Sequence, residues 1–253
     1  MTPDQLTGRR VAIWGLGKEG REAARLLADR PFVFLDDAES GPDQVDGHRV
    51  HRGASAIADA LLQTDVLIKS PGVSLYRPEI AAFQARGGIV TSLLNFWNAN
   101  RTDQALTLAI TGTKGKSTTA ALLAHVLAAL GRRVVLAGNI GVPVTEIRDP
   151  QADTLVLELS SYQTADFGGG CDLALVTSLY PEHLNWHGGE SIYYRDKLAL
   201  LQRARFRLAH GQVRTAAPHL LPPDVVFYDT FQGPLDNAYL ARPHNRANVG
   251  GVL

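Results

Sequence analysis

A short glycine-rich segment near the middle of the chain constrains the fold more than any other feature of the sequence. Residues 110–119 read ITGTKGKSTT and directly follow the apolar run LTLA at residues 106–109. A strand that ends in a glycine-rich turn and leads into a helix presents backbone N–H groups, and the positive end of the helix dipole, to an anion. The segment therefore predicts a phosphate-binding loop between a strand and a helix, with ATP as its expected ligand.

This loop is shorter than the general Walker pattern, because Ile110 stands where that pattern has its first glycine. Its two glycines still allow the backbone to approach phosphates, Lys116 can reach the β- and γ-phosphates, and the Ser117 hydroxyl suits Mg²⁺. An ordinary turn with a surface lysine is the alternative, which the apolar helix expected at residues 120–130 disfavours. The expected ATP contacts in the loop are Gly112, Thr113, Lys114, Gly115, Lys116, Ser117 and Thr118.

Short apolar runs alternate with helical stretches along the chain, at residues 11–14, 32–35, 66–68, 106–110, 134–136, 155–157 and 173–176. This alternation predicts an α/β protein with mainly parallel sheets covered by helices on both faces. The 253-residue length suits two domains, and the polar segment 98–103 is typical of a linker. We therefore expect a Rossmann-like parallel-sheet domain at residues 1–102 and a P-loop ATPase-like α/β domain at residues 103–253.

The overall charge excludes some classes of partner. Lys and Arg together number 25, as do Asp and Glu, so no basic field is available to hold nucleic acid or an anionic membrane.

The apolar stretch at residues 11–14 is too short for the core of a signal peptide or a membrane span. The only cysteine, Cys171, excludes an intramolecular disulfide and is typical of a reducing compartment. We expect a monomeric cytoplasmic protein.

A second glycine-rich turn, Gly15 to Gly20, has the pattern G-x-G-x-x-G and follows the first apolar run. Asp36 and Asp37 end the second run, where such folds commonly read a ribose hydroxyl or a base edge. Residues 70–72, Ser-Pro-Gly, form another sharp turn after the third run. Three interpretations remain open from these residues: an NAD site, a nucleotide-sugar site, and a turn without a ligand.

Two charged residues of the second domain have both a functional and a structural interpretation. Glu158 ends an apolar run, and near a phosphate loop such an acid commonly holds Mg²⁺, although it could instead cap a helix or face solvent. Lys197 lies in a helix expected at residues 191–201. The charged run Arg195-Asp196-Lys197 in this helix predicts a solvated face.

His183 and His187 are spaced as in a zinc helix. Leu184 occupies the position where a zinc protease has its catalytic glutamate, and Pro181 and Asn185 indicate a loop, so zinc is not expected. A single histidine that ligates a metal near the phosphates and a structural histidine both remain open.

Taken together, these features resemble the Mur ligases, which build the peptide stem of bacterial cell-wall precursors. The resemblance covers essentially the whole chain, and its motifs are the phosphate loop 112–117, ELSSYQ at 158–163, NIG at 139–141, the G-x-G-x-x-G turn and Ser-Pro-Gly at 70–72. ELSSYQ is the most discriminating of them, and it is similar to members that add D-glutamate to UDP-N-acetylmuramoyl-L-alanine. The expected partners are therefore these two substrates.

The resemblance implies an ATP-dependent carboxylate–amine ligase that forms a peptide bond. The substrate carboxylate would take the γ-phosphoryl group of ATP to become an acyl phosphate, and the amine of D-glutamate would then displace phosphate. Two Mg²⁺ ions would neutralise the crowded anions during this transfer.

The same resemblance implies roles for individual residues. Lys116 and Ser117 would hold the phosphates and the first Mg²⁺, and Glu158 and His183 would serve the metals. Lys197 would be carbamylated by CO₂ and, as an anion, would help to organise the second Mg²⁺. Asn245 and Asn248 would contact the adenine nucleotide. The contacts to the UDP-sugar would be Gly15, Leu16, Gly17, Lys18, Asp36, Asp37, Ser70, Pro71 and Gly72, with Asn139 and Ser160 at the muramoyl-alanine part.

Three residues depart from the family pattern. Glu182 and Asn185 stand where the family usually has Asp, which questions the metal geometry, and Lys114 stands where Asn is common, which changes the charge of the loop. The family also has a third, C-terminal domain that supplies most of the amino-acid site, whereas this sequence stops just after a helix entry at residues 242–249. We therefore expect a fragment that binds the UDP-sugar but turns over weakly or not at all.

Two other functions remain as alternatives. A folylpolyglutamate synthase shares the short loop and the carbamylated lysine, but it should begin almost at once with its ATP domain, whereas a whole nucleotide-type domain precedes Ile110 here. The second alternative is an NAD-binding regulatory module with a degenerate ATPase site.

Overall fold

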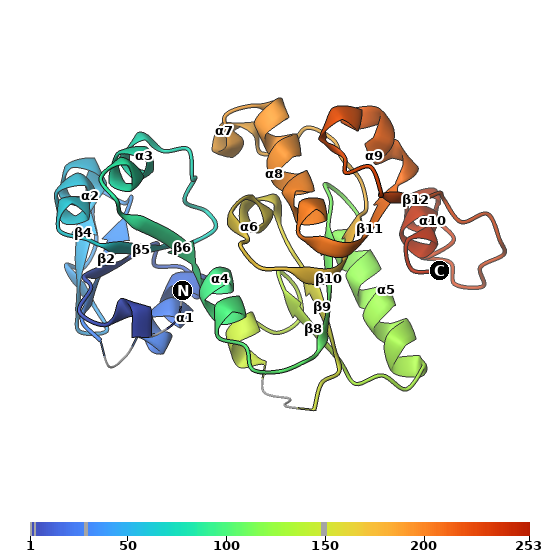
Figure 1. Cartoon of the computed structure of the whole chain (residues 1–253), viewed down its shortest axis with the longest axis horizontal. Coiled ribbons are helices and arrows are strands. Elements are labelled where there is room, and N and C mark those ends of the chain that lie inside the picture. The colour runs from blue at the N-terminus through green and yellow to red at the C-terminus, as the bar shows by residue number, and fades with distance from the viewer. Residues whose placement is uncertain (1, 3, 28–29, 148–150) are drawn as a thin grey trace. The chain divides into compact units, whose positions relative to one another are not determined.

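The computed structural model describes residues 2, 4–27, 30–147 and 151–253. The chain divides into two compact units, residues 1–101 and 102–253, each built around its own six-stranded sheet (Figure 1). Strands and helices alternate in both units, and nearly all strand pairs are parallel. The predicted α/β class is therefore confirmed.

The sheet of the first unit has the strand order β3-β4-β2-β1-β5-β6. Its strands are β1 (Val11–Trp14), β2 (Phe32–Asp36), β3 (Gln44–Val45), β4 (His48–Arg52), β5 (Val66–Lys69) and β6 (Ile89–Ser92). Only the β3–β4 pair, a short hairpin at one edge, is antiparallel. Its helices are α1 (Lys18–Leu26), α2 (Gly53–Leu62), α3 (Pro78–Ala85) and α4 (Leu93–Ala99).

Alternate side chains of β1 pack on opposite faces of this sheet. Val11 and Ile13 join a core cluster with residues of α1 and α4, whereas Ala12 and Trp14 join a cluster with residues of α2 and α3. This two-sided burial explains why β1 is apolar throughout. The chain leaves β1 for β2 on one side, and β5 lies on the other, so the turns after β1 and β5 flank the topological switch point where ligands of such sheets bind.

The sheet of the second unit is entirely parallel, with the order β12-β11-β10-β7-β9-β8. Its strands are β7 (Leu106–Thr111), β8 (Val134–Gly138), β9 (Thr154–Glu158), β10 (Cys171–Val176), β11 (Ala204–His210) and β12 (Val226–Tyr228). Its helices are α5 (Lys116–Ala129), α6 (Ser161–Asp166), α7 (Leu184–His187), α8 (Glu190–Gln202), α9 (Gly211–Ala216) and α10 (Pro243–Gly250).

Strand β7 lies between β9 and β10, so the phosphate loop that follows it meets the carboxyl ends of both neighbours. The connection through α5 runs from β7 toward β8, and the connections through α6 and α8 run in the opposite direction along the sheet. Right-handed crossovers then place α5 on one face and α6 and α8 on the other.

One local prediction is wrong. Pro181 and Asn185 indicated a loop, but residues Leu184–His187 form the short helix α7, which ends at a left-handed Gly188. No helix within the described part of the chain is both long and apolar enough to cross a membrane.

Candidate active site

The phosphate loop between β7 and α5 depends on two glycines in the left-handed region. Gly112 has φ of 146° and Gly115, the N-cap of α5, has φ of 89°. A Cβ atom at Gly112 would overlap the Thr177 hydroxyl, and one at Gly115 would overlap the side-chain oxygen of Asn248. Both positions therefore need glycine for conformation and for space.

The residues that follow β10 hold this loop in place. Thr113 N–H donates to the Ser178 carbonyl at 2.8 Å, and the Thr177 hydroxyl donates to the Lys114 carbonyl at 2.6 Å. The Thr113 hydroxyl also lies 2.7 Å from the Tyr193 hydroxyl of α8. The loop is thus shaped by two neighbouring elements before any ligand binds.

Two lysine amines converge on one carbonyl oxygen of the loop. Lys116 Nζ and Lys197 Nζ each donate to Gly112 O at 2.9 Å, and Lys116 Nζ also donates to Thr113 O at 3.1 Å. Lys116 comes from the start of α5 and Lys197 from the middle of α8. This pair of amines at the N-terminus of a helix is chemically suited to phosphate oxygens.

The composition-based prediction of a solvated face around Lys197 is wrong. Lys197 is 2 % exposed and Asp196 is 4 % exposed, because α8 packs this side against the sheet and α6. Burial, with a smaller effect from the neighbouring Lys116, lowers the pKa of Lys197 to about 7. The pKa of Lys116 is also lowered, mainly by burial. A substantial fraction of Lys197 is therefore a neutral amine near pH 7.

Glu158, at the end of β9, is fully buried. Its Oε1 accepts a hydrogen bond from Asn139 Nδ2 at 3.1 Å, whereas its Oε2 has no hydrogen-bond partner among the described residues. The solvent-facing alternative is thus wrong, and Ser160 rather than Glu158 caps the next helix. A buried carboxylate oxygen without a partner is costly, and a bound cation would compensate that cost. The donor chemistry fits Mg²⁺.

Ser160 has a structural role of its own. Its hydroxyl accepts from Gln163 N–H, and the Gln163 side chain accepts from Ser160 N–H at 3.0 Å, which makes a reciprocal capping box at the start of α6. Two of the six residues of the ELSSYQ motif, Ser160 and Gln163, are therefore explained by helix capping, whereas Glu158 makes no contribution to the cap.

The two candidate histidines differ in their surroundings. The His183 side chain is 47 % exposed, its backbone is left-handed with φ of 55°, and its Nε2 lies 3.7 Å from Glu182 Oε2. His187 is fully buried, with Nδ1 2.7 Å from Asp196 Oδ2 and Nε2 3.1 Å from Ser161 Oγ. His187 is thus the structural histidine, and it joins α6, α7 and α8.

Two of the three departures from the family pattern contact each other. Lys114 Nζ forms an ion pair with Glu182 Oε1 across 68 residues of sequence. The added cation in the loop is therefore balanced by the longer acid at position 182. Within the described ranges, no group of three or more His, Cys, Asp and Glu side chains gathers as a metal site.

Helix α10 places Asn248 beside the phosphate loop and Asn245 next to Asn248. Asn248 lies against Gly115 and donates to Asn245 Oδ1 at 3.0 Å, and Asn245 donates to the Tyr239 carbonyl at 2.8 Å. The Tyr239 hydroxyl in turn lies 3.3 Å from the Thr118 hydroxyl of α5. Sequence reasoning missed Tyr239, because no motif surrounds this exposed aromatic residue.

The predicted UDP-sugar residues of the first unit gather at the turns after β1, β2 and β5. Gly15 has φ of 112°, and a Cβ atom there would lie 2.5 Å from Ser70 Oγ, so these two turns are in contact. Gly17 is the N-cap of α1, which places Leu16 and Lys18 at the same helix end. Pro71 and Gly72 follow in the second turn.

Both predicted acids of the first unit are paired with arginines. Asp36 forms an ion pair with Arg52, and Asp37 forms one with Arg77 at 2.8 Å. The Arg77 guanidinium also lies 4.4 Å from the centre of the Trp14 ring. Neither arginine was predicted, because a scattered arginine carries no positional signal in a single sequence.

Comparisons with known proteins agree with this geometry. Residues 110–209 match the family model described as "Mur ligase middle domain". The UDP-N-acetylmuramoyl-L-alanine–L-glutamate ligase of Xanthomonas campestris pv. campestris (strain 8004) is 40 % identical over 289 residues, covering 100 % of this chain and 61 % of that protein. The enzyme of the same name from Xanthomonas axonopodis pv. citri (strain 306) is 43 % identical over 300 residues, with the same coverage. The chain thus spans about three fifths of the length of these relatives.

A solved structure shows the same fold at lower identity. The UDP-N-acetylmuramate:L-alanyl-gamma-D-glutamyl-meso-diaminopimelate ligase from Neisseria meningitides superposes with a TM-score of 0.56 at 19 % identity, covering 96 % of this chain and 91 % of that one.

Proposed function

We propose that this chain is a Mur ligase and that it carries the ATP site and the UDP-sugar site of a ligase that joins glutamate to UDP-N-acetylmuramoyl-L-alanine. The observation that supports this most strongly is the convergence of Lys116 and Lys197 on the loop carbonyl of Gly112. The names of the relatives favour such a cell-wall precursor ligase over a folylpolyglutamate synthase or an NAD-binding module.

ATP would bind with its phosphates at the N-terminus of α5. Lys116 Nζ donates to loop carbonyls in this structure, and phosphate oxygens would replace them as acceptors. The adenine nucleotide would lie toward Asn248, which lies against Gly115, toward Asn245 beside it in α10, and toward Tyr239, whose hydroxyl lies close to Thr118 of α5.

Mg²⁺ would be held by the Ser117 hydroxyl and by Glu158, whose Oε2 has no hydrogen-bond partner within the described residues, with His183 near a second ion. Bound Mg²⁺ supplies positive charge that neutralises the phosphates during transfer. Asn139 orients Glu158 through its hydrogen bond to Oε1.

Carbamylation of Lys197 is consistent with its surroundings. A pKa of about 7 leaves much of the amine unprotonated, and this is the form that attacks CO₂. The nitrogen gains a bond to the carbon of CO₂ and loses a proton, which leaves a carbamate anion. That anion would attract the neighbouring Lys116, whereas two protonated lysines at one carbonyl repel each other.

In the reaction, the alanyl carboxylate of the UDP-sugar would attack the γ-phosphorus of ATP, and ADP would leave. The amine of glutamate would then attack the resulting acyl phosphate, and phosphate would leave. Lys116 would stabilise the charge on the transferred group, because its amine is held at the loop beside it.

The UDP part would bind the first unit at its switch point. The diphosphate would face the Gly15–Gly20 turn, with Ser70, Pro71 and Gly72 opposite. Asp36 and Asp37 would lie toward the uracil end, where their arginine partners fix their orientation.

The relatives' names specify L-glutamate, whereas the sequence resemblance implied D-glutamate. We therefore propose L-glutamate as the amino acid.

The proposal is tested by measuring binding and turnover separately. Calorimetric titration with ATP and Mg²⁺ should show saturable binding that Lys116→Met weakens at least tenfold, about 1.4 kcal/mol. Lys18→Met, at the start of α1, is the matched control and should leave ATP binding unchanged. Absence of ATP binding would refute the proposed function.

Turnover is followed as ADP release with UDP-N-acetylmuramoyl-L-alanine and either isomer of glutamate. We expect weak or no release from the 253-residue chain and, where release is seen, stimulation by L-glutamate. Robust stimulation by D-glutamate alone would contradict the proposed isomer, and robust release with either isomer would contradict the expected low activity.

A further inference from the structure

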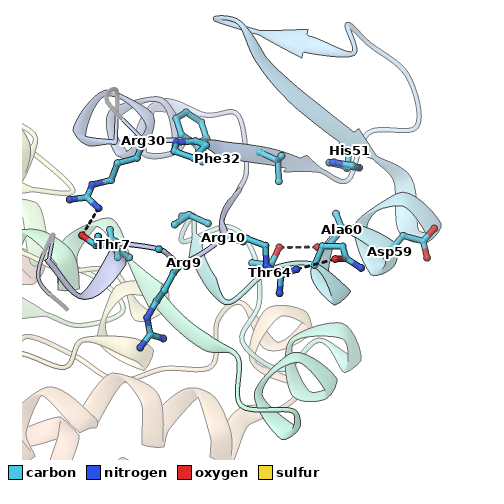
Figure 2. A pocket seen from close by; sticks show the side chains of 15 residues that line it. Thr7, Arg9, Arg10, Arg30, Phe32, His51, Asp59, Ala60 and Thr64 are labelled. Atoms are coloured by element: carbon cyan, nitrogen blue, oxygen red, sulfur yellow. Dashed lines mark hydrogen bonds between the residues drawn. The ribbon is translucent and has the colours of Figure 1, made fainter.

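The first unit contains a cavity of about 730 Å³ that is separate from the glycine-rich turns (Figure 2). It lies at the amino ends of β1 and β2, where Val11 and Phe32 begin their strands, and it reaches the end of α2. The turns that contain Gly15 and Ser70 follow the carboxyl ends of β1 and β5, at the other end of these parallel strands. The proposed UDP-sugar site does not account for this cavity.

The walls of the cavity are mainly apolar. Leu6 and Pro31 line it from the connecting segments, Val11 and Phe32 from the strands, and Ala60 from α2. Its volume lies within the range of small-molecule sites, which combine apolar walls with a few placed polar groups. The cavity is therefore large enough for a ligand with one or two rings.

The polar groups are distributed unequally between its two ends. Figure 2 shows Arg30 and Thr7 together at one end, and His51 and Asp59 at the other. Burial, together with Arg49, lowers the pKa of His51, which disfavours a positive charge at that end of the cavity.

Arg30 carries a charge that the described residues do not neutralise. Its Nη1 donates to the Thr7 hydroxyl at 3.2 Å, and it forms no ion pair with any residue that the structure describes. Arg10, which also lines the cavity, is different because it pairs with Asp65 at 3.0 Å and donates to Gln63. The half-buried Arg30 guanidinium thus has several donors available for an anion.

We propose that this cavity binds a small molecule with a flat apolar body and one anionic group, carboxylate or sulfonate, which is recognised by Arg30. The apolar body would lie along Val11, Phe32 and Ala60. The inference is independent of the ligase function, because no residue that lines the cavity belongs to the glycine-rich turn 15–20 or to the turn 70–72.

The test uses a matched pair of fluorescent probes. 8-Anilinonaphthalene-1-sulfonate has an aromatic body and a single sulfonate, and N-phenyl-1-naphthylamine has the same body without the charge. We expect saturable one-to-one binding of the sulfonate to the folded chain, with weaker binding of the neutral probe. Addition of UDP should not displace either probe.

Three variants distinguish this site from unspecific binding. Arg30→Ala should weaken binding of the sulfonate about tenfold and leave the neutral probe unchanged. Gln63→Trp, at an exposed position on the cavity wall, should weaken both probes by filling the space. Arg25→Ala removes an exposed arginine of α1 outside the cavity and should affect neither. Circular dichroism checks that each variant is folded.

The proposal is overturned if the sulfonate does not saturate, if Arg30→Ala and Arg25→Ala have equal effects, or if Gln63→Trp leaves both probes bound as before. Displacement of the sulfonate by UDP would also overturn it, because it would place the probe at the glycine-rich turns.

Discussion

At the scale of single residues, Lys197 shows how burial changes chemistry. The side chain belongs to a helix segment with neighbouring charges, yet it is 2 % exposed and its amine reaches the phosphate loop. Its folded-state pKa of about 7 lies well below the value of about 10.4 for an exposed lysine. Folding therefore releases a proton from this residue above pH 7.

The proton release predicts a pH-dependent stability. Between pH 7 and 10 the unfolded chain binds a proton at Lys197 that the folded chain does not, so the free energy of unfolding should rise with pH. Lys197→Met should remove a slope of up to about 1.4 kcal/mol per pH unit between pH 7 and 8.5. Urea unfolding at several pH values, in buffer purged of CO₂, measures how the free energy of unfolding depends on pH. Lys114→Met is the control, because its side chain is 74 % exposed. Equal slopes in wild type and Lys197→Met would contradict the assignment.

The single sequence could predict some site residues and not others. Lys116 and Glu158 stand in motifs, whereas the two asparagines of α10 were predicted from the family resemblance alone, and the structure brings Lys116 and Asn248 to the same loop. The burial of Lys197 could not be read from composition, because it depends on which side of α8 faces the sheet. Tyr239 and Arg77 were missed because they contact the predicted residues only through the tertiary fold.

At the scale of elements, helix α5 is bounded by two glycines with almost the same positive φ angle. Gly115 has φ of 89° at its start and Gly131 has φ of 84° just after its end. A Cβ atom at Gly131 would meet nothing within 4 Å, whereas one at Gly115 would overlap Asn248. Substitutions at these two glycines therefore distinguish the cost of backbone strain, which both share, from the cost of steric overlap, which only Gly115 has.

Alanine substitutions at these glycines should have unequal effects. Gly131→Ala should cost about 1 kcal/mol, the strain of a left-handed alanine. Gly115→Ala should cost about 2 kcal/mol or more, because Asn248 must also leave its hydrogen bond to Asn245. Urea unfolding gives both values, and equal losses would show that α10 does not restrict the loop. Only the Gly115 variant should lose ATP binding.

The strands that the sequence predicted most clearly are those that are buried on both faces of a sheet, because such strands are apolar along their whole length. Strands β1, β5, β7 and β9 are of this kind, and each expected run lies within the observed strand. Strand β4, with the sequence HRVHR, lies next to the edge of its sheet, and four of its five residues are polar, so no apolar run marked it. The edge strand β12 does lie in an apolar run, VVFY at residues 225–228, but this run was not predicted as a strand, and the strand itself has only three residues and is exposed at its first position.

At the scale of the whole molecule, the chain holds two units with separate sheets and separate glycine-rich turns. The domain boundary expected at residue 102 came from the polar segment 98–103 and the phosphate loop that follows it, and the assignment of the UDP-sugar to the first unit came from the family resemblance. The cavity at the amino ends of β1 and β2 was not predicted from the sequence, because its lining residues come from four segments that are separated along the chain.

Hydrogen exchange should distinguish the two proposed ligand sites. A non-hydrolysable ATP analogue with Mg²⁺ should slow amide exchange around residues 111–119 and 239–248, because these segments would surround the nucleotide. UDP-N-acetylmuramoyl-L-alanine should slow exchange around residues 14–20 and 70–72. Mass spectrometry of peptides reads both patterns, and protection of residues 14–20 by NADH instead would favour a dinucleotide site.

The ion pair between Lys114 and Glu182 links a loop residue to the segment before α7. The longer side chain of Glu182, in place of the usual aspartate, lets its carboxylate reach the Lys114 amine across the loop. The two departures therefore depend on each other, and in sister sequences an asparagine at 114 should accompany an aspartate at 182.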